Sequence, residues 1–192
     1  ASFAFAVAWG IDPNVAREAL AVARGVAGRV ERVDIGQPFA VVVDYAHSPD
    51  ALEKVLRMLR ALTAGRLIVV FGSAGERDVM KRSVMGRIAA QHADAMVVTD
   101  EDPRAEDPDL INRQIADGVR SAGGRDGETL WVVNDRRAAI AHAIRLATPG
   151  DVILLAGKGH EHNMFTAQGT VWWDEAKVAR QELRKAGYGK PR

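Results

Sequence analysis

Short apolar runs alternate with amphipathic stretches along most of the chain. Five runs are apolar on both faces and rich in β-branched residues, which predicts strands covered by helices on each side. These runs are residues 39–43, 67–71, 95–99, 130–133 and 152–155. Because a helical pattern separates each run from the next, the strands are expected to lie mostly parallel.

Helical spacing is clear after the first run. Ser48 and Pro49 form a helix-start signal, and the leucines that follow fall on one face. Further helices are predicted at residues 81–92, 109–122, 136–147 and 174–186, with an edge strand at residues 170–173. The pattern predicts a Rossmann-like, doubly wound α/β fold: a mostly parallel sheet of about six strands with helices on both faces.

The first 23 residues follow a different rhythm and predict two short helices, the second beginning at the Asp12-Pro13 cap signal. Residues 1–11 are apolar, but they lack a basic leader and are too short to span a bilayer. The chain starts without Met inside an Ala-rich run, so an internal cut is expected there.

Composition narrows the class of protein. With 192 residues, of which 47% are hydrophobic, one principal domain is expected. A formal net charge of +1 provides no long-range field for nucleic acid or an anionic membrane, so neither partner is expected. The absence of Cys removes disulfides and thiolate nucleophiles and favours a cytoplasmic setting.

Polar residues follow each predicted strand. The carboxyl ends of parallel strands share one edge of a sheet, where ligands bind in doubly wound folds. The segments that follow are D-Y-A-H at 44–47, G-S-A-G-E-R-D at 72–78, D-E-D-P-R at 100–104, N-D-R-R at 134–137 and A-G-K-G-H-E at 156–161. Together they place cations and carboxylates around one cleft. For any single loop, simple solvation or helix capping stays open as the alternative.

The glycine-rich segments match neither common phosphate-binding motif. Residues 72–75 do not form G-x-G-x-x-G, and Gly157-Lys158-Gly159 lacks the Ser or Thr of a P-loop. These glycines are expected to let the backbone approach a ligand closely. The five histidines show no ligand spacing beyond His160-Glu161-His162, whose neighbours point to opposite faces of an extended segment, so no metal site is expected.

At these same loops the sequence resembles the Mur ligases, and most closely the Mur E type, the UDP-N-acetylmuramoyl-tripeptide synthetases. G-R-V-E at 28–31 resembles the family's G-R-M-E, and V-D-Y-A-H-S-P-D-A-L at 43–52 resembles V-D-Y-A-H-T-P-D-A-L. G-E-R-D at 75–78, with Lys81 and Arg82, resembles G-D-R-D-x-x-K-R. E-D-P-R at 101–104 stands where the family has D-N-P-R, and A-G-K-G-H-E is unchanged.

This resemblance implies a cytoplasmic ATP-dependent ligase that adds the third residue of the peptidoglycan stem to UDP-MurNAc-L-Ala-D-Glu. Residues 1–27 would be the end of the central ATPase domain, truncated here, and residues 28–192 the carboxyl-terminal amino-acid-binding domain. ATP and Mg²⁺ would serve the full-length enzyme, and this chain alone would hold neither and be inactive. Its partners would be the UDP-linked dipeptide, a free amino acid, ATP and the remaining domains of the same polypeptide.

The resemblance also assigns residues to ligands, with no catalytic residue and no metal ligand in this chain. Contacts to the nucleotide would come from Arg29, Asp44 and His47. The pocket for the incoming amino acid would be formed by Arg77, Glu101, Asp102, Pro103, Arg104, Gly157 and Glu161. In that pocket Arg104 could bind a carboxylate in bidentate fashion, while Asp102 and Glu161 could hold an ammonium group.

The side chain of meso-diaminopimelate ends in both an ammonium and a carboxylate group, which would satisfy both signs of charge in this pocket, so that amino acid is favoured. Asp102 stands in place of the family's Asn, however, and its extra negative charge could favour lysine or ornithine. Two alternatives of function stay open. One is a non-catalytic module that binds an amino acid or nucleotide. The other is a Mur-like ligase of folylpolyglutamate or cyanophycin type, which the A-G-K-G-H-E and Y-A-H-S-P segments favour less.

Overall fold

A six-stranded, mostly parallel sheet forms the centre of the computed structural model, which describes residues 2–23 and 25–189. The outer ends of the two predicted domains, Ala1 and Arg192, lie outside the described residues. The strand order is β1-β2-β6-β3-β4-β5, with only β1 antiparallel to its neighbour. The strands are β1 (Glu31–Val33), β2 (Ala40–Asp44), β3 (Leu67–Phe71), β4 (Ala95–Val98), β5 (Leu130–Val132) and β6 (Val152–Ala156).

Strand β6 is the last of the sheet in sequence, yet it lies between β2 and β3. In the register of β2 with β6, Asp44 stands opposite Ala156, so both strands end at the same level. The loops that follow them therefore leave the sheet side by side. The order of the strands reverses at this point, where doubly wound folds place their ligands.

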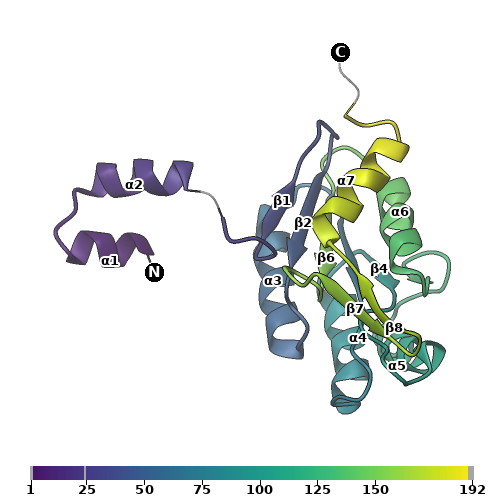
Figure 1. Ribbon diagram of the computed structural model, residues 1–192. Coiled ribbons are helices and arrows are strands. Elements are labelled where there is room, and N and C mark those ends of the chain that lie inside the picture. Colours follow the sequence, from purple (N-terminus) through teal and green to yellow (C-terminus); the bar gives the residue numbers. More distant parts are fainter. Residues whose placement is uncertain (1, 24, 190–192) are drawn as a thin grey trace.

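Helices cover both faces of the sheet (Figure 1). The core on one face is formed with α3 (Pro49–Leu62), α4 (Met80–His92) and α5 (Pro108–Ser121). The core on the other face is formed with α6 (Arg136–Leu146) and α7 (Glu175–Lys185). Side chains alternate between the two cores along each strand, so that Ile153 and Leu155 join the second and Leu154 the first. The doubly wound fold is confirmed, and so is burial on both faces for β2, β3, β4 and β6. The edge strand β5 is the exception, because Val132 is exposed.

The helices begin where short polar side chains can cap them. The Ser48 hydroxyl accepts a hydrogen bond from the Ala51 N–H of α3, and the Asp135 carboxylate accepts one from Ala138 N–H at 2.7 Å. Asp107 and Asp174 cap α5 and α7 in the same way. Each cap satisfies an N–H that the first helical turn leaves unpaired. The predicted helices lie within a residue or so of their expected bounds.

Residues 170–173 were predicted to form an edge strand of the main sheet, and this prediction is wrong because the strand pairs elsewhere. Those residues form β8 (Gly169–Trp172), which pairs antiparallel with β7 (Asn163–Thr166) in a separate hairpin. The turn between them uses Gly169 at φ 121°, a conformation open to glycine. Strand β7, which ends three residues before β8 begins, forms the backbone hydrogen bonds that β8 would otherwise have made at the edge of the main sheet. The sixth strand of the main sheet is β1.

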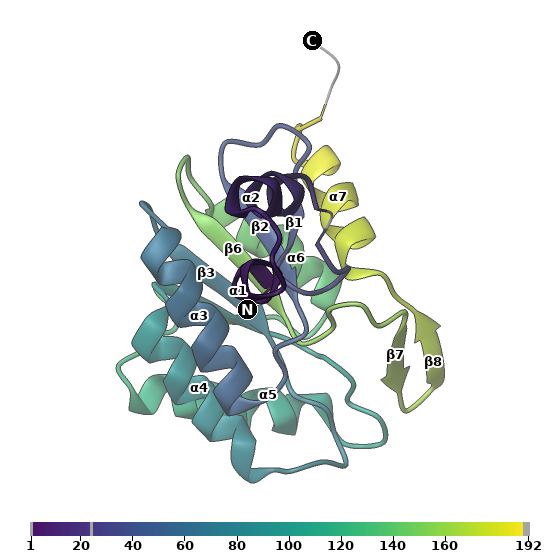
Figure 2. The same cartoon turned by 90° about the vertical axis from the view of Figure 1, so that its left-hand side faces the viewer.

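The two predicted amino-terminal helices are present as α1 (Ser2–Ala8) and α2 (Pro13–Val22). They stand beside the sheet and its helices (Figures 1 and 2). Of the residues described in this pair, only Ala16 is buried, and large apolar side chains such as Trp9 and Val22 are exposed. Throughout the described part of the chain, none of the helices has the length and apolar character to cross a membrane.

Candidate ligand-binding site

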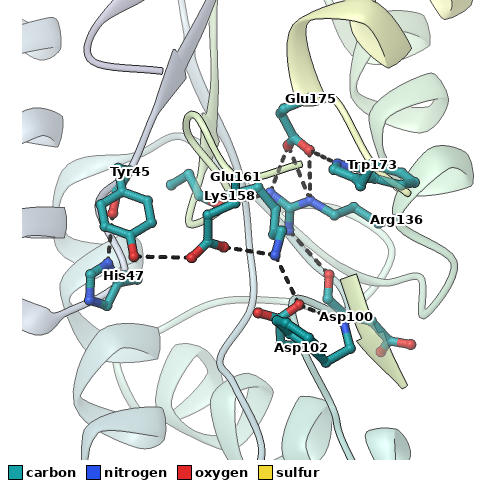
Figure 3. A network of polar contacts seen from close by, with 11 residues as sticks. Tyr45, His47, Asp100, Asp102, Arg136, Lys158, Glu161, Trp173 and Glu175 are labelled. Atoms are coloured by element: carbon teal, nitrogen blue, oxygen red, sulfur yellow. Dashed lines mark hydrogen bonds and ion pairs between the residues drawn. The ribbon is translucent and has the colours of Figure 1, made fainter. Parts of the chain in front are cut away.

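Loops from three strands meet at the carboxyl edge of the sheet in a chain of hydrogen bonds (Figure 3). The Tyr45 hydroxyl, after β2, donates to Glu161 Oε1 at 3.1 Å. Lys158 Nζ, after β6, donates to Glu161 Oε2 at 2.8 Å and to Asp102 Oδ1 at 2.9 Å. Residues separated by up to 116 positions in the sequence are thus in direct contact.

Lys158 is the buried centre of this network, with a side chain 0% exposed. A buried ammonium group is tolerated only when carboxylates and hydrogen bonds compensate for its lost hydration. Asp102 supplies one carboxylate and also accepts a hydrogen bond from Phe165 N–H at 3.0 Å. The negative charge that Asp102 adds to the family pattern therefore already has a cation of the protein beside it.

Glu101 is also buried, and its side chain lies against the loop after β6. A Cβ built on Gly157 would lie 2.7 Å from Glu101 Oε2, and Gly157 has φ 109°, so only glycine fits there. Within the described residues this oxygen has no hydrogen-bond partner. Burial raises the pKa of the Glu101 carboxyl, because the charged form loses its hydration.

Arg104 is half-buried at the start of the loop that leads to α5. Its N–H donates to Phe165 O at 3.0 Å, and its guanidinium carbon lies 5.3 Å from the centre of the Phe165 ring. No ion pair joins its guanidinium to any side chain within residues 2–23 and 25–189, and the buried Nε has no hydrogen-bond partner there. A cation held by stacking alone is open to an anionic ligand.

Arg77 lies on a loop that packs against the Arg104 loop. Gly75 N–H donates to Asp102 O at 2.8 Å, and a Cβ on Gly75 would lie 2.0 Å from Pro103 O. Pro103 thus supports the contact between the two loops. The Arg77 side chain itself is exposed, with a single hydrogen bond to Glu76 O at 3.3 Å.

The three residues assigned to a nucleotide lie together at the neighbouring end of the edge. The Asp44 carboxylate accepts hydrogen bonds from Val30 N–H and Ala46 N–H, both at 2.9 Å. The Arg29 guanidinium carbon lies 4.7 Å above the Tyr45 ring, and the His47 ring lies 4.5 Å from the same ring. The Tyr45 ring therefore contacts both the Arg29 guanidinium and the His47 imidazole.

Backbone strain is concentrated in these loops. Three non-glycine residues of the described chain have positive φ: Val30 at 49°, Glu76 at 54° and Arg104 at 56°. One lies in each of the three segments that carry the Arg29, Arg77 and Arg104 side chains. Left-handed backbone costs about 1–2 kcal/mol for a residue with a Cβ, and such strain is typical of functional sites.

The loop after β5 does not contribute ligand-facing side chains as the sequence predicted. Asp135 caps α6, and Arg136 is fully buried, where it pairs with Glu175 at 2.7 Å and donates to Ala156 O. Arg137 pairs with Glu182 at 2.8 Å. For this loop the helix-capping alternative is correct at Asp135, while Arg136 and Arg137 form ion pairs within the protein, which the sequence analysis did not anticipate.

Lys81 and Arg82 also have partners within the protein. Arg82 is buried and donates to Gln114 and Glu106, both at 2.8 Å, which joins α4 to α5 and to the Arg104 loop. Lys81 Nζ donates to His47 O at 2.8 Å. Both side chains hold site loops in place.

Two residues that complete the network, Tyr45 and Lys158, were not among those assigned to a ligand. Both stand inside the motifs quoted above, so the motifs are the signal that could have identified them. Among the residues that the structure describes, no group of three or more His, Cys, Asp or Glu side chains could hold a metal ion.

Comparisons with known proteins identify relatives over nearly the whole chain. A family described as "Mur ligase, glutamate ligase domain" matches residues 28–159. A UDP-N-acetylmuramyl-tripeptide synthetase of Roseiflexus sp. (strain RS-1) is 49% identical over 189 residues, which are 98% of this chain and 37% of that protein. A UDP-N-acetylmuramoyl-L-alanyl-D-glutamate--2,6-diaminopimelate ligase of Syntrophomonas wolfei is 47% identical over 184 residues, covering 96% of this chain and 37% of the relative.

A solved structure of a UDP-N-acetylmuramoyl-L-alanyl-D-glutamate--2,6-diaminopimelate ligase superposes with a TM-score of 0.76 at 31% identity. The match covers 97% of this chain and 37% of that one. The chain therefore spans a little over a third of the length of these relatives, at 37% in each case.

Proposed function

The chain belongs to the Mur ligase family, and from that premise we propose that it is the carboxyl-terminal, amino-acid-selecting part of an ATP-dependent ligase. That ligase adds meso-diaminopimelate to UDP-MurNAc-L-Ala-D-Glu during peptidoglycan synthesis. Residues 1–27 close the central ATPase domain in this proposal, and residues 28–192 form the domain that receives the amino acid. The cytoplasmic location expected for such a ligase stays a prediction.

One observation carries the choice of amino acid: the edge of the sheet carries one uncompensated charge of each sign. Glu161 and Asp102 share the single Lys158 ammonium, which leaves one net negative charge, and the Glu161 side chain is the more accessible carboxylate at 34% exposed. Arg104 has no ion pair within the described residues, so its positive charge is also uncompensated. The far end of diaminopimelate, which bears both an ammonium and a carboxylate group, complements the two charges together.

Lysine and ornithine end in an ammonium group alone. Either would leave the Arg104 guanidinium without a carboxylate, at a cost of about 1–3 kcal/mol if the group is desolvated. That cost corresponds to a preference of roughly five- to 150-fold for diaminopimelate. The 2,6-diaminopimelate in the name of the Syntrophomonas wolfei relative supports the same choice.

In the proposed reaction ATP phosphorylates the dipeptide carboxylate, and the amine of the incoming amino acid attacks the acyl phosphate. The new C–N bond replaces the bond to phosphate, which leaves, and the amine loses a proton. The role of this chain is to hold the amine in position, which lowers the barrier by restricting orientation. Arg29, Asp44 and His47 contact the nucleotide, while Glu101, Asp102, Pro103, Gly157 and Arg77 shape or border the pocket of Arg104 and Glu161. Magnesium would be bound by residues outside this chain.

The full-length polypeptide that contains this chain provides the test. Ligation is measured with diaminopimelate, lysine and ornithine side by side, for the wild type and for Arg104→Ala. We expect diaminopimelate to be used best, and Arg104→Ala to raise the KM for diaminopimelate about tenfold or more while the KM for ATP stays within about twofold.

Arg87→Ala is the matched control, because Arg87 is an exposed arginine on α4 that carries no role in the site. It should leave both constants unchanged. Failure of the wild type with all three amino acids would reject the proposed ligase. An Arg104→Ala enzyme with an unchanged KM for the amino acid would reject the proposed pocket.

A further inference from the structure

Tyr45 lies at the boundary between the two groups of site residues. Three cationic or aromatic side chains surround its ring: Arg29 at 4.7 Å, His47 at 4.5 Å and His160 at 4.9 Å. Two of the three belong to the nucleotide group. At its other end the hydroxyl donates to Glu161, the carboxylate assigned to the amino acid. A single rigid ring thus spans both groups.

The hydroxyl is held as a hydrogen-bond donor. Burial and the neighbouring Glu161 carboxylate raise the pKa of the Tyr45 phenol, so it keeps its proton. Glu161 receives a second hydrogen bond from Lys158 on its other oxygen. Its carboxylate is therefore fixed between two donors, the fully buried Lys158 and the half-buried Tyr45 (Figure 3).

The segment that carries Arg29 is fixed against the same loop. A Cβ on Gly28 would lie 2.1 Å from His160 N, and Val30 N–H donates to Asp44 beside Tyr45. A ligand that orders Arg29 therefore acts on a closely packed set of residues that ends at Glu161.

We propose that Tyr45 is a positioning residue that couples nucleotide binding to amino-acid binding through its hydrogen bond to Glu161. This inference rests on the proposed function. A nucleotide seated against Arg29 and His47 fixes the orientation of the Tyr45 ring, and the fixed hydroxyl holds Glu161 in the position that receives the ammonium group. Since coupling between two sites is reciprocal, diaminopimelate must tighten nucleotide binding by the same factor.

Tyr45→Phe in the full-length ligase isolates this role, because it keeps the ring and removes only the hydroxyl. Binding of diaminopimelate is measured by calorimetry with and without a non-hydrolysable ATP analogue. We expect the analogue to tighten binding to the wild type by about fivefold or more, as is typical of coupled sites. In Tyr45→Phe this factor should fall to about one, while binding of the analogue without diaminopimelate should stay within about twofold of the wild type. Because the coupling is reciprocal, the KM for diaminopimelate and the KM for ATP, each measured with the other substrate present, should both rise about threefold or more.

The control is Tyr188→Phe, at the other tyrosine of the chain, which packs edge-on against Phe39 and lies outside the network. It should retain the wild-type factor. The inference is overturned if Tyr45→Phe keeps the coupling of the wild type, if it weakens binding of the analogue in the absence of diaminopimelate, or if the wild type shows no coupling at all. A wild-type enzyme that does not ligate diaminopimelate would reject the proposed function instead, so the two failures are distinguishable.

Discussion

Arg104 combines an unpaired guanidinium with a strained backbone. Its φ of 56° costs about 1–2 kcal/mol that glycine would avoid. The N–H of this residue bonds Phe165 O, while the side chain lies over the Phe165 ring. The strain therefore orients the guanidinium, and in the proposed pocket it trades stability for a ligand contact.

Lys158 and Asp102 should behave as one unit in stability measurements. Replacing Lys158 by Met leaves the Asp102 carboxylate buried without its cation, which should lower the free energy of unfolding by about 3–5 kcal/mol. Adding Asp102→Asn removes the stranded charge and should recover at least about 2 kcal/mol of that loss. Urea denaturation of the two single variants and the double variant measures this coupling.

Lys54→Met is the control for that cycle, because Lys54 pairs with Asp50 on the surface of α3 and its side chain is 74% exposed. Its effect should stay within about 0.5 kcal/mol. Additive effects of Lys158→Met and Asp102→Asn would contradict a coupled buried pair.

At this scale the sequence predicts which residues belong to the site better than it predicts what each contacts. The motifs identified Glu161 and Asp102, but a separation of 116 residues between Tyr45 and Glu161 leaves no local pattern for their hydrogen bond. Nor does the sequence distinguish Arg82, which is buried between helices, from the exposed Arg77. Such assignments depend on how helices and loops pack, which no spacing rule contains.

Among the elements, α4 and α5 approach each other through glycine. A Cβ on Gly86 would lie 2.1 Å from Ile115 O, and one on Gly118 would lie 2.1 Å from Ser83 O. The backbones of the two helices are thus in contact, which places the loop before α5 against the loop before α4. The Arg77 and Arg104 loops owe their proximity to this contact.

Gly86→Ala should destabilise the protein although alanine is the better helix former by about 1 kcal/mol. The clash is with backbone, which cannot rotate away, so the free energy of unfolding should fall by about 1–3 kcal/mol. Chemical denaturation measures it. Gly25→Ala, where no atom lies within 4 Å, is the control and should change stability by less than about 0.5 kcal/mol. An equally stable Gly86→Ala protein would show that the two helices can separate at little cost.

The strands that the sequence predicted best are those in the interior of the sheet. The strands β2, β3, β4 and β6 have apolar runs because helices cover them on both faces, and burial leaves a strong pattern. The edge strand β5 was also predicted, although Trp131 is half-buried and Val132 is exposed. The two that were missed, β1 and β7, are short and lie outside the interior of the sheet: β1 has three residues and β7 four. Short strands at an edge or in a hairpin are defined by their partners rather than by their own composition.

For the molecule as a whole, acid stability should depend on a carboxylate at the end of the sheet opposite the site. Asp151 is buried just before β6 and accepts hydrogen bonds from Arg66 N–H at 2.8 Å and Thr148 N–H at 2.9 Å. Burial alone would raise the pKa of Asp151, but these bonds and the Arg66 guanidinium outweigh it and hold the pKa below its ordinary value.

A lowered pKa in the folded state means that the unfolded state binds protons first as the pH falls. The stabilisation from Asp151 is therefore complete above the unfolded-state pKa of about 3.9 and is lost as the pH falls through the lower folded-state pKa. At pH 7 Asp151→Asn should lower the free energy of unfolding by about 1–3 kcal/mol, and the difference from the wild type should shrink below about pH 4.

Urea denaturation of both proteins across pH 3 to about pH 7 measures this difference. Asp117→Asn is the control, since the Asp117 side chain is 70% exposed on α5, and it should show little effect at any pH. A constant difference between Asp151→Asn and the wild type down to the lowest pH would contradict the assignment.

The strand order has a consequence for how such proteins diversify. The residues proposed to bind the amino acid come mainly from the loop after β4. Those proposed for the nucleotide come from the segment before β1 and from the end of β2 and its following loop, and β6 and β3 lie between β2 and β4. Under the proposed function, residues 101–106 can therefore change and alter the amino acid accepted while the residues assigned to the nucleotide stay as they are. Exchanging that one loop between relatives is then a direct way to alter the proposed selectivity.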